Sequence, residues 1–120
     1  MTEETLTEDV NPDRPVLLDT EAELDALVAD EPLVLVEFYT DGCGICQSME
    51  PVLSGVAATS EAVVATVNPR DDPPLIERFT VRKVPLLVLF VDGEPVARYD
   101  EGFIGTDELS EWVAEHRAAA

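Results

Sequence analysis

The 120-residue sequence has few basic residues, and this shortage excludes two classes of partner. It contains 7 lysines and arginines against 26 aspartates and glutamates, a formal net charge of −19. Such a surface repels nucleic acid and anionic lipid, because binding to either depends on protein cations. The sequence also lacks any apolar run as long as a membrane-spanning helix. We therefore expect neither a nucleic-acid partner nor a membrane partner.

The acidic residues are spread over the whole chain, from Glu3 to Glu115, through every polar segment. A docking patch for one basic partner would instead gather them in one place. Diffuse acidity with a single lysine, Lys83, resembles the proteins of salt-accumulating halophiles, in which molar salt screens the repulsion between like charges. Of these two interpretations, the composition favours adaptation to salt.

Length and composition predict one domain, because 120 residues with a 46% hydrophobic share are enough for a single core. Residues 1–15 are acidic, include two prolines and have little apolar content, so they are expected to form a flexible leader. They lack the basic-then-apolar plan of a secretory signal, which favours a cytoplasmic protein. The folded domain is expected over residues 16–118.

Strand and helix patterns alternate through the expected domain. Short β-rich runs predict strands at 16–18, 33–40, 62–67 and 86–91, and the Asp92-Gly93 turn predicts a returning strand at 95–100. Apolar residues at helical spacing predict a helix capped by Asp19 or Thr20. They also predict helices over 47–58, over 75–79 and over 106–116, the last capped by Thr106. This order predicts an α/β fold with a central mixed β-sheet, parallel at first and antiparallel at the end, flanked by helices on both faces.

Glu37 lies inside the strand expected at 33–40, which is apolar on both faces. A carboxylate at that place should lie in or near the core. Its burial costs free energy unless the group is protonated, hydrated or paired.

The chain has only two cysteines, Cys43 and Cys46, within the stretch D-G-C-G-I-C-Q. A structural zinc site needs four ligands, and the only histidine, His116, lies 70 residues beyond Cys46, so a metal would have to be shared across a dimer. A disulfide staple closing so short a loop would remove little unfolded-state entropy. Redox chemistry fits better, because Cys43 falls at a helix start that favours a thiolate, and Cys46 one turn later can resolve a mixed disulfide.

Several features in the right order resemble the thioredoxin family over about Val16 to His116. VLVEFYTDGCGIC resembles the family's central strand running into its CxxC helix, and Pro51 falls where that helix carries a kinking proline. VRKVPLLVLF resembles the segment with the family's cis-proline, and VDGEPVARYDEG resembles the closing hairpin. The resemblance implies a thioredoxin fold and a thiol–disulfide oxidoreductase that reduces protein disulfides.

The resemblance also implies roles for individual residues. Cys43 would attack the substrate disulfide and Cys46 would resolve the mixed disulfide. Glu37 stands where the family carries a buried aspartate that assists proton transfer at the resolving cysteine. The expected substrate-binding residues flank the cysteines, form the cis-proline segment or follow the closing hairpin: Gly42, Gly44, Ile45, Val84, Pro85 and Gly102.

The implied partners are disulfide-bearing proteins and a thioredoxin reductase or equivalent, since the chain has no nucleotide-binding loop of its own. No cofactor is expected, because the two thiols are the redox group, and a monomer is expected. Gly42 and Ile45 replace the family's usual tryptophan and proline, and Thr66 replaces a lysine found in many members. In this family, replacing that proline tends to raise the redox potential. A more oxidising, isomerase-type relative and a non-catalytic binding module therefore stay open as alternatives.

Overall fold

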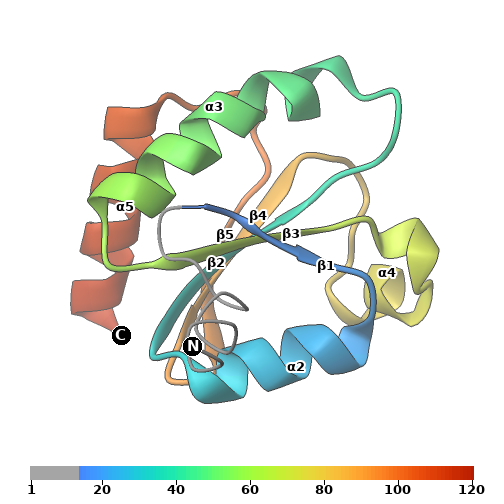
Figure 1. Ribbon diagram of the computed structural model, residues 1–120, viewed down its shortest axis with the longest axis horizontal. Helices are drawn as coiled ribbons and strands as arrows, with labels where there is room; N and C mark the ends of the chain where they lie inside the picture. The colour runs from blue at the N-terminus through green and yellow to red at the C-terminus, as the bar shows by residue number, and fades with distance from the viewer. Residues whose placement is uncertain (1–13) are drawn as a thin grey trace, which may run out of the picture.

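A five-stranded mixed sheet forms the centre of the computed structural model, which describes residues 14–120 (Figure 1). The strands, in the spatial order β1-β3-β2-β4-β5, are β1 (Val16–Leu18), β3 (Val63–Val67), β2 (Leu33–Phe38), β4 (Leu86–Val91) and β5 (Glu94–Tyr99). Strands β1 and β2 run parallel to β3, whereas β4 is antiparallel to β2 and to β5. The predicted α/β fold with a mixed sheet is thus confirmed. Of the predicted leader, residues 1–13 lie outside the described residues.

Helices cover both faces of this sheet. They are α2 (Glu21–Asp30), α3 (Gly44–Thr59), α4 (Pro74–Arg78) and α5 (Thr106–Ala119), with a short 3₁₀ helix, η1 (Pro69–Asp71), before α4. Figure 1 shows α3 and α5 on one face and α2 and α4 on the other. Each face has its own apolar core, and the two cores share no residue. This three-layer arrangement is the one that alternating strands and helices predict.

Strand β2 contributes to both cores through the alternation of its side chains. Val34, Val36 and Phe38 pack in the core of the α2 and α4 face, and Leu33 and Leu35 pack in the core of the α3 and α5 face. Because successive side chains of a strand point to opposite faces, Glu37 belongs with Leu33 and Leu35. The sequence of β2 therefore directs a carboxylate toward α3.

The helix and turn signals of the sequence are mostly confirmed. Thr20 caps α2, its hydroxyl accepting a hydrogen bond from the backbone N–H of Glu23. Asp92 and Gly93, at φ values of 51° and 85°, form the predicted turn between β4 and β5. The prediction that Thr106 caps α5 is wrong. Gly105 is the N-cap, in an extended conformation with φ −77° and ψ 167°, and Thr106 is already the first helical residue.

Helices α3 and α5 approach each other closely at Gly55. A Cβ atom at Gly55 would lie 2.9 Å from Cγ2 of Thr106 and 3.3 Å from its Oγ1. Real Cβ atoms essentially never approach another heavy atom within 3.0 Å. The absence of a side chain at position 55 thus fixes how near the start of α5 comes to α3.

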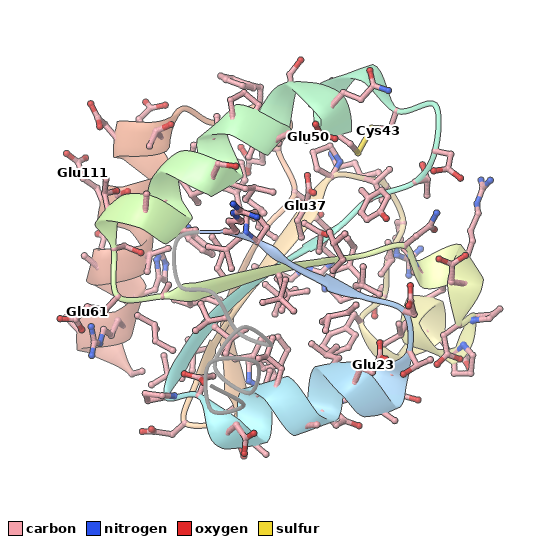
Figure 2. The ribbon with its side chains drawn as sticks, in the orientation of Figure 1. Glu23, Glu37, Cys43, Glu50, Glu61 and Glu111 are labelled. Carbon is pink, nitrogen blue, oxygen red and sulfur yellow. A yellow bond between two sulfur atoms is a disulfide. The ribbon has the colours of Figure 1, made fainter. Side chains whose placement is uncertain are left out.

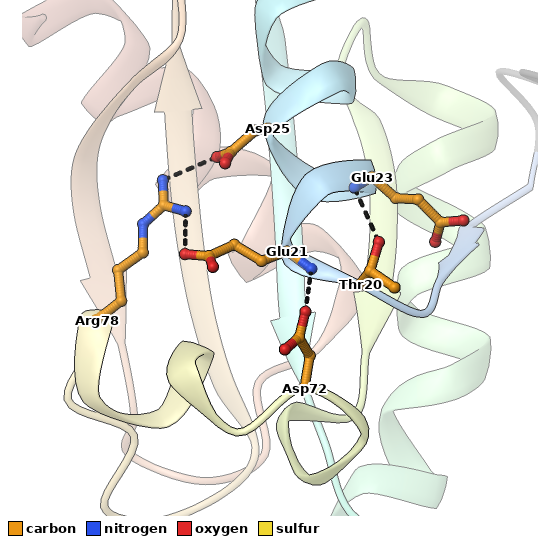
Figure 3. A network of polar contacts seen from close by, with 6 residues as sticks. All are labelled: Thr20, Glu21, Glu23, Asp25, Asp72 and Arg78. Carbon is orange, nitrogen blue, oxygen red and sulfur yellow. Dashed lines mark hydrogen bonds and ion pairs between the residues drawn. The ribbon is translucent and has the colours of Figure 1, made fainter.

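A cluster of polar contacts joins the start of α2 to the η1–α4 region, and we call it the α2 network (Figure 3). Its six residues are Thr20, Glu21, Glu23, Asp25, Asp72 and Arg78. Arg78 contacts two carboxylates, Glu21 at 2.7 Å and Asp25 at 2.9 Å. The side chain of Asp72 accepts a 2.8 Å hydrogen bond from the backbone N–H of Glu21, a donor at the free end of the helix. The carboxylates of Glu21, Asp25 and Asp72 therefore each have a partner.

Candidate active site

The two cysteines lie where β2 passes into α3. Gly42, with φ +80°, makes the turn after the strand in a conformation that favours glycine. Cys43 is the N-cap of α3, and its Sγ accepts a 3.1 Å hydrogen bond from the backbone N–H of Cys46. The two cysteines form a disulfide with their Cα atoms 5.2 Å apart. Because Cys43 is half-buried and Cys46 is 5% exposed, an approaching molecule meets Cys43 first.

The other predicted site segments end at the same edge of the sheet. The Val84–Pro85 bond is cis, as the resemblance implied. Leu86, the next residue, pairs with Phe38 at the end of β2, so Pro85 lies beside the strand that leads to Cys43. Gly102, with φ +91°, follows β5, whose last residue pairs with Leu87 near the start of β4. The topology thus brings three segments distant in sequence to one edge.

Two exposed apolar side chains accompany these segments. Ile45, in the first turn of α3 after Gly44, is 48% exposed. Phe103, next to Gly102, is 55% exposed. Sequence reasoning did not single out Phe103. Its position directly after Gly102, a glycine that the family resemblance places at the site, could have indicated it. Together they give this edge an apolar surface.

Glu37 is buried, with 2% of its surface exposed. In the sheet it lies opposite Thr66 of β3 on one side and Leu87 of β4 on the other. Within residues 14–120, its Oε2 atom has no hydrogen-bond partner. Burial, and secondarily the negative charge of Glu50, raise the pKa of Glu37 from 4.5 to about 8. At neutral pH the group is therefore mostly protonated in this disulfide form.

A cleft of about 700 Å³ connects Glu37 and Cys46 with the surface, and we call it the Glu37 cleft. Glu37 and Thr66 line it from the sheet, Cys46 and Glu50 from α3, and Arg14 from the segment before β1. Figure 2 shows Glu37 and Glu50 in the region of Cys43 under α3, whereas Glu61 and Glu111 lie at the far side of the molecule. The cleft gives the buried carboxylate and the inner cysteine a common route to solvent.

Sequence reasoning missed two charged residues among those that line the cleft, Glu50 and Arg14. Glu50 follows Cys46 by four residues, the spacing that puts two side chains on one face of a helix, and this signal could have found it. Arg14 fell within the predicted leader, and no pattern in the sequence links it to the site. Both are exposed, so they lie at the outer part of the cleft.

The site offers no cluster suited to a metal ion. Within the described part of the chain, no three histidine, cysteine, aspartate or glutamate side chains gather as ligands. His116 is on α5, where its Nδ1 lies 2.8 Å from the carbonyl oxygen of Trp112 and its ring packs against that indole. Trp112 in turn packs against the core on the α3 and α5 face of the sheet. Among residues 14–120, no helix is both long and apolar enough to span a bilayer.

Comparison with known proteins identifies the family. The model of the thioredoxin family matches residues 15–115. A thioredoxin of Chlamydia caviae is 35% identical over 85 residues, which cover 70% of this chain and 82% of that protein. A thioredoxin of Mycobacterium tuberculosis is 37% identical over 76 residues, which cover 62% of this chain and 65% of that protein. The sequence similarity thus includes the CxxC segment and the sheet around it.

Solved structures agree with this assignment. A mutant thioredoxin from Halobacterium salinarum superposes with a TM-score of 0.83 at 36% identity, covering 89% of this chain and 94% of that one. Its halophilic source agrees with the salt adaptation inferred from the acidic composition. A thioredoxin of Plasmodium falciparum superposes with a TM-score of 0.74 at 20% identity, covering 82% of this chain and 96% of that one. At this low identity the similarity supports the fold alone. This chain belongs to the thioredoxin family, and it is a thiol–disulfide oxidoreductase with a Cys43–Cys46 redox pair.

Proposed function

We propose that this protein reduces disulfides of other proteins by dithiol exchange, with Cys43 as the attacking thiol and Cys46 as the resolving thiol. One observation carries this assignment: Cys43 is the more exposed of the two, and its Sγ accepts the backbone N–H of Cys46 at the start of α3. A helix N-terminus and an N–H donor both favour the thiolate, which is the reactive form. Buried Cys46 is placed to act second.

The exchange proceeds in two balanced steps. The Cys43 thiolate attacks one sulfur of the substrate disulfide, which forms a mixed disulfide and releases the other substrate sulfur as a thiolate. Cys46 then loses its proton and attacks Sγ of Cys43, which expels the second substrate thiolate. The substrate gains two electrons and takes up two protons in becoming a dithiol, and the protein is left with the Cys43–Cys46 disulfide.

Glu37 is proposed as the group that exchanges a proton with Cys46. Both residues line the Glu37 cleft, and Glu37 has no competing hydrogen bond at Oε2 within residues 14–120. The pKa of Glu37 is about 8 in the disulfide form, so at neutral pH it holds a proton that it can give to Cys46 when the disulfide is reduced. When Cys46 attacks Cys43 and the disulfide forms again, the carboxylate of Glu37 accepts the proton of the Cys46 thiol.

The edge around the cysteines is proposed to bind an extended segment of a protein substrate. The backbone of Val84 would pair with the substrate main chain, as in β-strand addition. Exposed Ile45 and Phe103 would contact apolar side chains of the substrate. The remaining residues proposed to shape this surface are Gly42, Gly44, Pro85 and Gly102. Such a surface suits a polypeptide better than a small molecule.

The reduced state is proposed to be restored by a thioredoxin reductase or an equivalent enzyme, with the protein acting as a monomer. A reducing compartment such as the cytoplasm suits this cycle, because there the dithiol form is maintained. We also propose that the acidic surface is an adaptation to salt. The free energy of unfolding should then rise between low and molar KCl, and a constant value would contradict the adaptation.

The roles of the two cysteines are tested by Cys43→Ser and Cys46→Ser in a disulfide-reduction assay with dithiothreitol as the electron source. We expect Cys43→Ser to lose turnover and Cys46→Ser to accumulate a mixed disulfide with the substrate, detected by mass spectrometry of the trapped protein. Full turnover by Cys43→Ser would contradict the proposal.

A second candidate function, a more oxidising isomerase-type activity, is favoured by one observation. Ile45 stands between the cysteines where a proline is usual in the family, and it is half exposed at the start of α3. An equilibrium redox titration in molar KCl with thiol trapping separates the two. A two-electron transition at about −270 mV supports the disulfide-reducing function, and one at about −180 mV supports the isomerase-type function.

A further inference from the structure

Glu50 is a carboxylate beside the redox pair for which the exchange mechanism provides no role. It follows Cys46 by four residues on α3, so both side chains lie on one face of the helix. Both line the Glu37 cleft, which Glu37 also lines from β2. Glu50 is exposed and Glu37 is buried, so the cleft holds one carboxylate at its solvent side and one at its protein side.

Among the charged groups that line the cleft, Glu50 is the one whose charge, after burial, raises the pKa of Glu37. No described residue forms an ion pair with Glu37, and the residue opposite it in β3 is the uncharged Thr66. The negative charge of Asp41 acts instead on Tyr39, whose pKa it helps to raise after burial. The titratable and charged groups that line the cleft besides Glu37 are Arg14, Tyr39, Asp41, Cys46 and Glu50.

We propose that Glu50 is a positioning residue for disulfide exchange, whose carboxylate, at the solvent side of the cleft that it shares with Glu37 and Cys46, adds to the effect of burial in keeping Glu37 protonated. Its importance for the reaction rests on the role of Glu37 in the proposed function. The influence of Glu50 on Glu37 does not depend on that role and can be measured by itself.

The direction of the effect follows from the sign of the charge. A nearby anion disfavours a second anion, so Glu50 adds to the rise that burial causes in the pKa of Glu37. Without Glu50, Glu37 should ionise at lower pH, and a smaller fraction would hold a proton for Cys46 at neutral pH. Because Glu50 is exposed, dissolved salt should weaken its influence.

The test is a pH titration of the Glu37 carboxyl carbon by NMR in the oxidised full-length protein, at low ionic strength. Glu50→Gln removes the charge, and Glu111→Gln is the matched control. Glu111 is exposed on α5, lies far from the cleft and has no ion pair among residues 14–120 (Figure 2). We expect the midpoint to fall by about half a pH unit or more in Glu50→Gln and to stay in place in Glu111→Gln. Glu50→Asp should keep most of the wild-type midpoint.

Equal midpoints in Glu50→Gln and Glu111→Gln would overturn the proposal, and so would a midpoint in Glu50→Asp as low as in Glu50→Gln. The pH profile of reduction by dithiothreitol, recorded for the same variants and for Glu37→Gln, tests the proposed function separately. If Glu37→Gln leaves that profile unchanged, the proton-transfer role of Glu37 fails, while the carbon titration still decides whether Glu50 controls its ionisation. The two failures are therefore distinguishable.

Discussion

The α2 network and the Glu37 cleft treat carboxylates in opposite ways. In the α2 network, Arg78 contacts both Glu21 and Asp25 on a partly exposed surface (Figure 3). In the Glu37 cleft, a glutamate that is 2% exposed has a carboxyl oxygen with no partner among residues 14–120, and Glu50, which lines the same cleft, adds a negative charge. Among the described residues, one arginine thus pairs with two acids at the surface, whereas no arginine pairs with the acid inside, although Arg14 lines its cleft.

Stability alone would favour the reverse arrangement. An ion pair at the surface contributes only about 0–1 kcal/mol, whereas a buried carboxylate without a partner is strongly unfavourable. An unpaired buried acid does, however, have a strongly shifted pKa, which is a property typical of groups that transfer protons. The comparison therefore supports the proton-exchange role proposed for Glu37, because folding stability alone does not account for an unpaired buried acid.

Glu37→Gln tests the difference between the two regions most strongly, because it removes the titrating carboxyl group of Glu37 but keeps the shape of the side chain. The folded-state pKa of about 8 lies above the unfolded value of 4.5, so the favourable contribution of Glu37 is complete below 4.5 and is lost as the pH rises through 8. Above pH 8 the variant should exceed the wild type in free energy of unfolding by up to about 5 kcal/mol. At pH 4 the two should be similar. Urea unfolding of the oxidised proteins at both pH values measures the difference.

The control for this experiment is Glu111→Gln, which removes one negative charge from the exposed face of α5. The difference in free energy of unfolding between Glu111→Gln and the wild type should change little between pH 4 and pH 9. A pH dependence in Glu37→Gln no larger than in this control would mean that Glu37 ionises as an ordinary surface glutamate.

A second way to break the contrast is to give Glu37 a cation with Thr66→Lys. Thr66 lies directly opposite Glu37 in the parallel register of β3 and lines the same cleft. An ammonium group there should lower the pKa of Glu37 by about 1–3 units, as an opposite charge within a few ångströms does. Carboxyl NMR measures the shift, and Thr66→Met, of similar length but uncharged, is the control. If the Glu37 carboxyl group titrates with the same midpoint in Thr66→Lys and Thr66→Met, the lysine does not reach the carboxylate.

The smallest effect is expected when the α2 network loses its cation. Arg78→Gln should lower the free energy of unfolding by about 1 kcal/mol or less, since the pairs are partly exposed, and the loss should shrink in molar KCl. Disulfide reduction should be unaffected. Arg117→Gln, which breaks the single pair with exposed Glu61, is a matched control in chemical denaturation. A loss of several kcal/mol in Arg78→Gln would make the α2 network as important for stability as the core.

The sequence predicted the fold well because its signals are local. The period-2 and helical patterns, the Thr20 cap and the Asp92-Gly93 turn each depend on a few neighbouring residues. Thr106 was misplaced by one position because glycine is also an acceptable N-cap, and only the backbone angles of Gly105 decide between the two.

The candidate site was predictable in part. The CxxC motif and the proline after Val84 are read directly from the chain, and Glu37 stands out as an acid in an apolar strand. The Glu37 cleft was not predictable, because α3, three strands and the segment at Arg14 form it together. The charge of Glu50 matters only once that tertiary arrangement brings it near Glu37.

The close approach of α3 and α5 at Gly55 has a consequence for sequence comparison. Alanine at position 55 would place its methyl group against the threonine methyl at 106, so the two positions cannot vary independently. Relatives that carry alanine at 55 are expected to carry a smaller residue at 106, such as serine. The two positions should therefore covary across an alignment of the family, although neither takes part in the chemistry at the other end of the helix.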